Sequence, residues 1–209
     1  MEELFVDGQI YRACTPKTMR ECFSTWRQSL TSDETKALRR YRKKMGLKNN
    51  INAKLRSGVV PRDAEIISGA LQRAVISEPI VVYRSLAKQE NIDMSKMQEG
   101  SVFACPDFKG THIGNIITDW HKSGHYMLIL IPPKVHAAYI NNTTFWFTYE
   151  KELLIDKGQC FRLLEKRKIF GRDGYVIRVE NKLCFDSICF PAEEAFRRSS
   201  FWLENGAEF

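Results

Sequence analysis

The hydrophobic pattern changes its period at Pro79, and this change restricts the fold more than any other feature of the chain. Before Pro79, apolar residues such as Ile67, Leu71 and Ala74 recur at intervals of three and four, as in a helix with one buried face. After it, residues 80–84 form a β-branched run typical of a buried strand. Because helices come first and strands follow without alternation, the order predicts an α+β fold rather than a doubly wound parallel sheet.

The first third of the chain is expected to be helical. Thr31-Ser32-Asp33-Glu34 is a helix-start signature, and Pro61 is a residue that suits the first turn of another helix. Residues 1–30 predict only a lead-in with weak helical character near 19–29. The expected helices are 31–46, 51–58 and 61–77.

The remainder predicts strands within the same single domain of 209 residues. The expected strands are 80–84, 100–104, 108–112, 126–131, 152–155, 160–164 and 175–179, with a final short strand near 188–190. Turns are expected at 156–158 and 171–174. We therefore divide the domain into a mainly helical lobe (1–78), a mainly β core (79–190) and a C-terminal tail (191–209).

Composition indicates a soluble chain without a bound metal. The longest apolar run, 126–131, is too short to span a bilayer, and the N-terminus lacks the pattern of a signal peptide. His121 and His125 stand four residues apart, but Gly124 interrupts any helix between them, so we expect loop histidines rather than metal ligands. The six cysteines form no CxxC pair and are expected to be reduced. We also expect the protein to be a monomer.

The net charge of +7 and the pI near 9.1 suit an acidic partner, either a nucleic acid, an anionic membrane face or an acidic protein. The positive charge is concentrated in residues 39–44 and 162–172. These two basic runs are also what the solvated face of a helix and the solvated face of a strand look like. Charge alone therefore indicates solubility and steering, not a function.

Two carboxylates stand two residues apart where the strand at 152–155 begins. Alternation along a strand places Glu150 and Glu152 on one side and Lys151 on the other. Three aromatic residues, 145–147, precede them. A carboxylate pair beside displayed aromatics suits a cationic substrate that carries a ring, although two solvated glutamates at a strand end would look the same.

Arg84 ends the first predicted core strand. An arginine in such a place requires an anion, because its charge is not removed by deprotonation. The phosphates of a dinucleotide would serve, and so would a carboxylate of the protein itself. Neither a G-x-G-x-x-G nor a G-x-x-x-x-G-K sequence occurs, so a nucleotide would be held by a different kind of site.

These motifs, in this order, resemble the signatures of mono-ADP-ribosyltransferases of the arginine–STS–ExE type, found in bacterial exoenzymes and effectors and in phage-encoded enzymes. The resemblance covers about residues 30–180. It is carried by Leu38 to Tyr41, Ile51-Asn52, Leu55-Arg56, Tyr83-Arg84-Ser85-Leu86, Gly100-Ser101-Val102-Phe103, Phe108-Lys109-Gly110-Thr111-His112, Tyr149-Glu150-Lys151-Glu152-Leu153-Leu154 and Gly158-Gln159-Cys160-Phe161-Arg162.

The resemblance implies a split β-sandwich that binds NAD as a substrate, with helices packed on one side. Arg84 would contact the NAD phosphates. Glu152 would hold the ribose hydroxyl beside the scissile bond and stabilise an oxocarbenium-like transition state. Glu150 would orient and deprotonate the acceptor, which a glutamate at this position predicts to be arginine. Residues 145–147 would lie in the substrate-recognition loop, and 115–125, with Trp120, where a loop covers the nicotinamide.

The middle motif departs from the family pattern. The threonine is present as Thr111, but the first serine, which in the family supports the catalytic glutamate, is Gly110 here. His112 is a candidate to supply the missing hydrogen bond. We place Gly110, Thr111 and His112 with Arg84 on the NAD-binding side of the site.

We therefore expect an arginine-directed protein ADP-ribosyltransferase that acts on a target protein, for example an effector in a host cytoplasm. One alternative is a non-catalytic module that binds NAD or a partner without turnover. Another keeps the chemistry but transfers ADP-ribose to nucleic acid, which the basic charge would permit.

Overall fold

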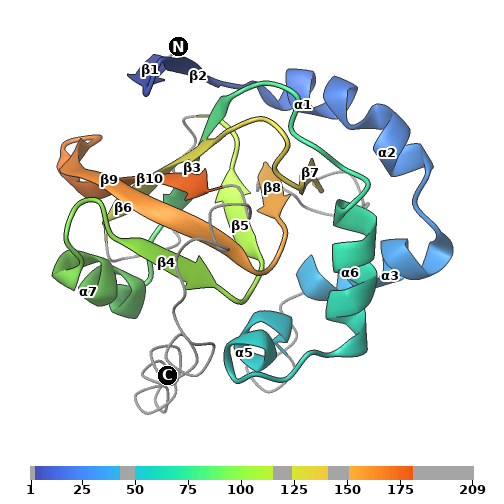
Figure 1. The fold of residues 1–209 in the computed structure, drawn as a ribbon. Coiled ribbons are helices and arrows are strands. Elements are labelled where there is room, and N and C mark those ends of the chain that lie inside the picture. Colours follow the sequence, from blue (N-terminus) through green and yellow to red (C-terminus); the bar gives the residue numbers. More distant parts are fainter. Residues whose placement is uncertain (1–2, 43–49, 115–123, 141–150, 181–209) are drawn as a thin grey trace.

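The structure, a computed structural model, describes residues 3–42, 50–114, 124–140 and 151–180. It combines one ten-stranded sheet with helices packed around it (Figure 1). The helices are α1 (Pro16–Cys22), α2 (Ser24–Gln28), α3 (Ser32–Arg42), α5 (Ile51–Arg56), α6 (Arg62–Leu71) and α7 (Lys88–Lys96). The strands are β1 (Glu3–Val6), β2 (Gln9–Ala13), β3 (Ile80–Ser85), β4 (Val102–Cys105), β5 (Lys109–His112), β6 (Tyr126–Ile131), β7 (Ala137–Tyr139), β8 (Glu152–Ile155), β9 (Gln159–Ile169) and β10 (Arg172–Glu180).

The predicted order of helices before strands needs two corrections, one at α7, which lies between β3 and β4, and one at the N-terminus. The chain begins with the β1–β2 hairpin, so the helical part starts only at Pro16. Asp7 and Gly8 form the turn with φ values of 49° and 78°. Asp-Gly with positive φ at both positions is a strong hairpin signal, because such a turn matches the twist of the two strands. The signal was in the sequence, but strands of four and five residues are too short to show a clear alternation.

Strand β3 lies at the centre of the sheet and joins its two parts. It pairs with β6 in antiparallel register over six residues, and with β2 in parallel register. Its pairing with β5 consists of a single register pair, Tyr83 with His112. Among the described residues, the group β5–β8–β7 is therefore paired with the rest of the sheet only near the end of β3, next to Arg84. We call this place the β3–β5 junction.

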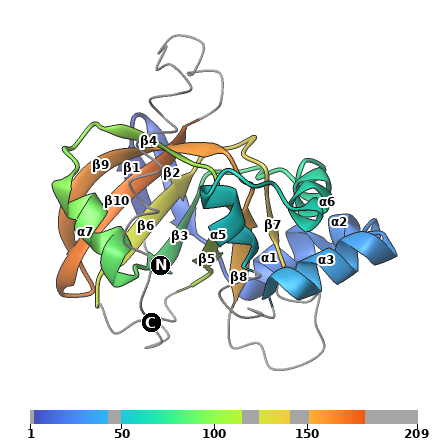
Figure 2. The ribbon, with the colours of Figure 1, turned by 90° about the horizontal axis from the view of Figure 1, so that it is seen from below.

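Helices cover the sheet at both of its ends. Helices α1, α2, α3 and α6 gather beside β7 and β8, and α7 lies at the opposite end near β9 and β10 (Figures 1 and 2). Leu38 of α3, Ile67 of α6 and Leu153 to Ile155 of β8 are fully buried in one continuous core. Burying each such side chain is worth about 1.5–3 kcal/mol, so β8 is firmly held.

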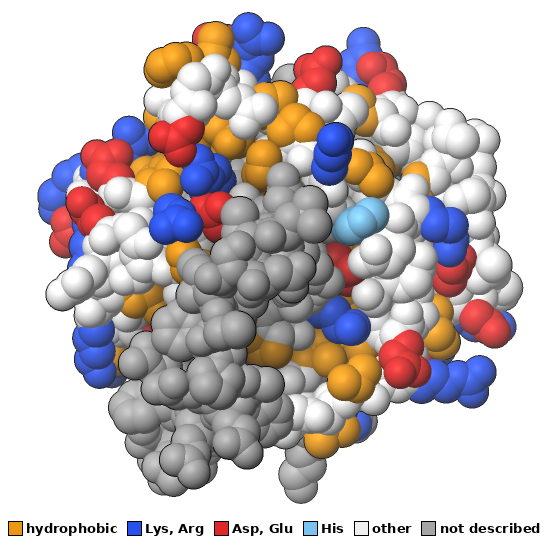
Figure 3. Space-filling view, in the orientation of Figure 1, with side chains coloured by type: hydrophobic (Ala, Val, Ile, Leu, Met, Phe, Trp, Pro, Cys, Tyr) orange, Lys and Arg blue, Asp and Glu red, His pale blue; other side chains and the backbone are white. Residues whose placement is uncertain are grey.

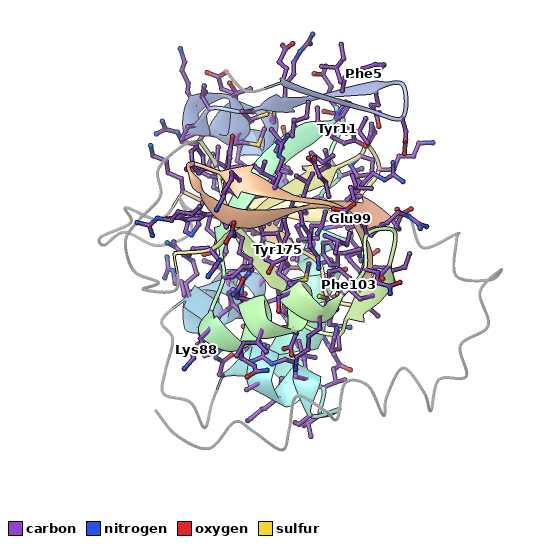
Figure 4. The ribbon with its side chains drawn as sticks, turned by 90° about the vertical axis from the view of Figure 1, so that its left-hand side faces the viewer. Phe5, Tyr11, Lys88, Glu99, Phe103 and Tyr175 are labelled. Atoms are coloured by element: carbon purple, nitrogen blue, oxygen red, sulfur yellow. The ribbon has the colours of Figure 1, made fainter. Side chains whose placement is uncertain are left out.

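A second, smaller core lies on the other face of β3 and β6, under the β1–β2 hairpin. Tyr11 of β2 is only 1% exposed and packs there with Val81 and Leu128. Phe5, on β1, is 73% exposed and lies at the outer side of the hairpin (Figure 4). With both faces covered, every residue of β6 is buried, which explains why this strand is a continuous apolar run rather than an alternating one.

Candidate active site

Glu152 is the first residue of β8, and the three apolar residues after it are completely buried. The register places Glu152 opposite His112 of β5. Backbone hydrogen bonds fix both sides of this strand start: Ile113 N donates to Lys151 O at 2.8 Å, and Ile140 N donates to Glu152 O at 3.1 Å. The carboxylate, whose side chain is 15% exposed, is thus presented at the edge of the core by a rigid strand.

Gly110 lies directly against the Glu152 carboxylate. The two residues are on the same face of the β5–β8 pair, since Gly110 is two positions from His112. A Cβ atom added to Gly110 would lie 2.6 Å from Oε1 of Glu152, closer than real Cβ atoms approach other heavy atoms. The glycine in the middle motif therefore leaves space that the carboxylate fills.

The last turn of α3 contributes two residues beside the same carboxylate. Nε of Arg42 is 3.7 Å from Oε2 of Glu152, and the Arg42 side chain is only 7% exposed. The Tyr41 hydroxyl accepts a hydrogen bond from Nδ2 of Asn52 at 3.3 Å. Burial, reinforced by the charge of Glu152, raises the pKa of the Tyr41 phenol, so the hydroxyl stays protonated.

Arg84, at the end of β3, lies on the other side of Gly110. Its Nη1 donates to Gly110 O at 2.8 Å, and its Nη2 donates to both carboxylate oxygens of Glu90 at 3.1 Å. Nζ of Lys109 donates to the same carboxylate at 3.3 Å. Burial would raise the pKa of Glu90, but Arg84 and Lys109 outweigh it and lower the pKa to about 2. Two cations thus share one ionised carboxylate, which leaves a local excess of positive charge.

Thr111 has a different place from its two neighbours in the motif. Its side chain is on the opposite face of β5, is 1% exposed, and donates from Oγ1 to Leu153 O at 2.9 Å. The hydroxyl therefore joins β5 to β8 instead of facing the Glu152 carboxylate. His112 shares the face of Gly110 and Glu152 and is partly exposed. The junction thus brings together Arg84, Gly110, His112 and Glu152.

Residues 19–183 match the profile of the ADP-ribosyltransferase exoenzyme family. The chain belongs to this family. The reaction of the family is transfer of ADP-ribose from NAD, which is consumed as a substrate. A comparison with curated protein sequences found no match.

Solved structures of ADP-ribosyltransferase toxins share the fold. Plx2a from Paenibacillus larvae is 17% identical, with a TM-score of 0.66 over 79% of this chain and 94% of that one. C3stau2 from S. aureus, solved with NAD, is 14% identical, with a TM-score of 0.68 over 82% and 99%. BECa from C. perfringens, solved with NADH, is 19% identical, with a TM-score of 0.66, and this chain spans 54% of it. These likenesses confirm the mixed fold of helices and a large sheet.

Several residues expected at the ADP-ribosyltransferase site lie outside the described residues. They are Glu150, the aromatic residues 145–147, Trp120 and His121. Of the two histidines considered as metal ligands, His125 is described, with Nδ1 3.2 Å from Asp173 O. Within the described ranges, no cluster of three or more His, Cys, Asp or Glu residues is arranged to hold a metal ion. Within the same ranges, no helix is long and apolar enough to cross a membrane.

Sequence reasoning missed three charged residues of the site: Arg42, Glu90 and Lys109. Glu90 could have been anticipated, since a buried arginine needs a carboxylate and Glu90 follows Arg84 by six residues. Arg42 gave no such signal, because it belongs to the basic run 39–44, which resembles a solvated face. In the structure, the side chain of Arg42 from that run is buried beside the Glu152 carboxylate.

Arg40 of the same run donates two hydrogen bonds of 2.6 Å to Asp63 of α6, and this pair joins α3 to α6. The face of the molecule in Figure 3 carries basic and acidic side chains close together over its described part. The positive charge of this ADP-ribosyltransferase therefore does not gather into one basic patch on the described part of that face.

Proposed function

We propose that Glu152 is the catalytic residue of an NAD-dependent mono-ADP-ribosyltransferase and that Arg84 and Lys109 bind the NAD pyrophosphate. The observation that carries this proposal is the β3–β5 junction, where Glu152 and Arg84 lie on either side of Gly110. The Glu152 carboxylate suits a developing positive charge, and the Arg84 guanidinium suits an anion. Both kinds of group are needed at one site if NAD is to be held and cleaved.

The carboxylate of Glu152 fits the bond-breaking step. Cleavage of the nicotinamide–ribose bond develops positive charge on the ribose, and a fixed carboxylate stabilises it. Glu152 is held by a buried strand and is mostly shielded from water, so its charge acts through a medium of low dielectric constant. Glu152 would also accept a hydrogen bond from the ribose hydroxyl beside the scissile bond.

The Arg84 cluster fits the pyrophosphate. Glu90 holds the guanidinium through a bidentate pair, which fixes its orientation. The Arg84 side chain is 28% exposed, so part of it is open to a ligand. Since Lys109 adds a second cation to the single Glu90 carboxylate, an anionic ligand is favoured.

The acceptor we propose is an arginine of a target protein, with Glu150 as the group that removes its proton. A guanidinium is a poor nucleophile while it is protonated, so a carboxylate within hydrogen-bond reach is required. We place the activity in a host cytoplasm, as that of an effector or toxin, and expect a monomer of one domain. The finer fold we propose is a split β-sandwich, divided at the β3–β5 junction.

Labelled NAD incubated with a cell lysate tests the proposal. Wild type is expected to label a discrete protein band, and Glu152→Ala is expected to label none. Glu165→Gln is the matched control, because Glu165 is a strand glutamate whose side chain is 52% exposed, and it should label like wild type. Mass spectrometry of the band would identify the acceptor residue.

Three results would point elsewhere. NAD binding without any release of nicotinamide would favour the non-catalytic module. A labelled product that disappears on nuclease treatment would make nucleic acid the acceptor. Label on a residue other than arginine would overturn the acceptor but not the enzyme class.

A further inference from the structure

The support of Glu152 differs from the pattern that the family resemblance implies. In that pattern a serine hydroxyl supports the catalytic glutamate from the position of Gly110. Here no side chain is present at that position, and the Glu152 carboxylate fills the space instead, with Oε1 where even a Cβ would be only 2.6 Å away. The support must therefore come from another direction.

Arg42 approaches the carboxylate from the side of α3. Oε1 of Glu152 faces Gly110, whereas Oε2 is 3.7 Å from Nε of Arg42. The Arg42 side chain is 7% exposed, and a guanidinium so buried keeps its charge and requires an anion nearby. The Glu152 carboxylate meets this requirement.

The end of α3 is fixed firmly enough to serve as a support. Leu38, one turn before Arg42, is completely buried. Beside Arg42, the Tyr41 hydroxyl is bonded to Asn52, whose side chain also donates to Phe108 O at 3.0 Å and accepts from Phe108 N at 3.2 Å. Through these bonds the end of α3 is connected to α5 and to the segment that enters β5.

We propose that Arg42 is a positioning residue that holds the Glu152 carboxylate in place of the missing serine hydroxyl, and that Gly110 provides the space this arrangement needs. This inference rests on the proposed role of Glu152. The two supports compete for one place. The atom that a Cβ at 110 would meet is Oε1, the far end of the Glu152 side chain, so a serine at 110 would push the carboxylate out of the place in which Arg42 holds it.

This competition gives a test in which one substitution has opposite effects in two backgrounds. The variants are Arg42→Ala, Gly110→Ser and the double variant, and the reaction is hydrolysis of NAD by water, measured as nicotinamide release. We expect Arg42→Ala to lower kcat about 10- to 100-fold with KM for NAD changed less than about threefold, since positioning acts on the transition state. Gly110→Ser alone should lower kcat by about 10-fold or more.

The double variant decides the question. Its kcat should be at least about three times that of either single variant. With Arg42 removed, the carboxylate can move, and the serine hydroxyl can form a hydrogen bond to it. Arg42→Lys should recover part of the activity, since it restores the charge. Arg12→Ala is the control, because Arg12 also forms an ion pair, with Glu3, but its side chain is 61% exposed and on β2.

Thermal unfolding of the same variants provides a readout that does not depend on turnover. Gly110→Ser should lower the unfolding temperature in the wild-type background but much less in a Glu152→Ala background, where no carboxylate opposes the new side chain. Unchanged kcat in Arg42→Ala, or a double variant no better than Arg42→Ala, would overturn the inference. If wild type releases no nicotinamide, the proposed function fails, and equal unfolding shifts in the two backgrounds would then reject the inference as well.

Discussion

The two partly buried ion pairs at the β3–β5 junction are built differently. Arg84 and Glu90 are six residues apart and form a bidentate pair with Nη2 at 3.1 Å from both oxygens. Arg42 and Glu152 are far apart in the chain, and the distance between Nε and Oε2 is 3.7 Å, longer than a hydrogen bond. The first pair also includes Lys109, whose Nζ contacts the same Glu90 carboxylate.

The difference suits the two roles that we propose. The carboxylate of Glu90 is used to orient cations, so its oxygens can be engaged within the protein. In the role that we propose, the carboxylate of Glu152 binds the substrate, and an ion pair of 3.7 Å restrains it less tightly than the bidentate pair restrains Glu90. Three substitutions or conditions separate the two pairs, and a fourth tests the contact between β5 and β8 beside them. They are given from the largest expected effect to the smallest.

Glu152→Gln should have the largest effect, and it should appear in catalysis. The amide keeps the size of the side chain but removes the negative charge that, in our proposal, stabilises the ribose cation. We expect kcat for nicotinamide release to fall about 10²- to 10³-fold, the range seen when one stabilising group is lost. Steady-state kinetics measures this, and a kcat within tenfold of wild type would remove Glu152 from its proposed role.

Glu90→Ala should act mainly on stability. It leaves Arg84 and Lys109 without their shared carboxylate, and breaking a buried pair in this way costs about 3 kcal/mol of unfolding free energy. Urea unfolding measures the loss. Asp93→Ala, on the same helix, is the control and should cost less than about 1 kcal/mol, since the hydrogen bonds that Asp93 accepts from Gln89 are exposed to solvent. Equal losses in both variants would refute the distinction.

The pH dependence of stability should report the same carboxylate. The pKa of Glu90 is lowered from 4.5 to about 2 in the folded protein, so its contribution is complete above pH 4.5 and is lost as the pH falls toward 2. The contribution amounts to about 3 kcal/mol. Urea midpoints measured between pH 6 and pH 2 should therefore fall less steeply in Glu90→Gln than in wild type. Parallel curves for the two proteins would show that Glu90 is not the group responsible.

Thr111→Val should have the smallest effect. It removes the hydrogen bond from Oγ1 to Leu153 O inside the core, and one such bond contributes about 1 kcal/mol. Thr111→Ser keeps the hydroxyl and should retain most of that stability, which thermal unfolding can resolve. A loss in Thr111→Ser as large as that in Thr111→Val would assign the effect to packing instead of to the bond.

The sequence was informative where local pattern decides structure. Strands β6 and β8 were predicted at their observed bounds, because the buried residues of each strand follow one another in the sequence as a continuous apolar run. Strands β9 and β10 extend further than expected and meet at a turn at Phe170 and Gly171, where φ is positive at both residues. The exposed basic residues near this turn concealed the strand pattern.

Helix α7 was missed for a related reason. Its residues are mostly polar and only Met94 is buried, so the chain there shows no apolar face of helical period. The same limit applies to the site. The resemblance placed Arg84, Gly110 and Glu152 in order, but the contact between Arg42 and Glu152 joins residues far apart in the chain, and a basic run gives no indication of which arginine turns inward.

The close packing of Gly110 against Glu152 also restricts how such a site can change by single substitutions. An arginine at 42 that is gained while a serine still stands at 110 would meet an occupied space. If Arg42 positions Glu152 as we propose, loss of the serine first would leave a weakly held carboxylate that the arginine would then restrain. On that proposal glycine at 110 is the permissive step, and relatives that keep the serine should carry a smaller or uncharged side chain where this chain has Arg42.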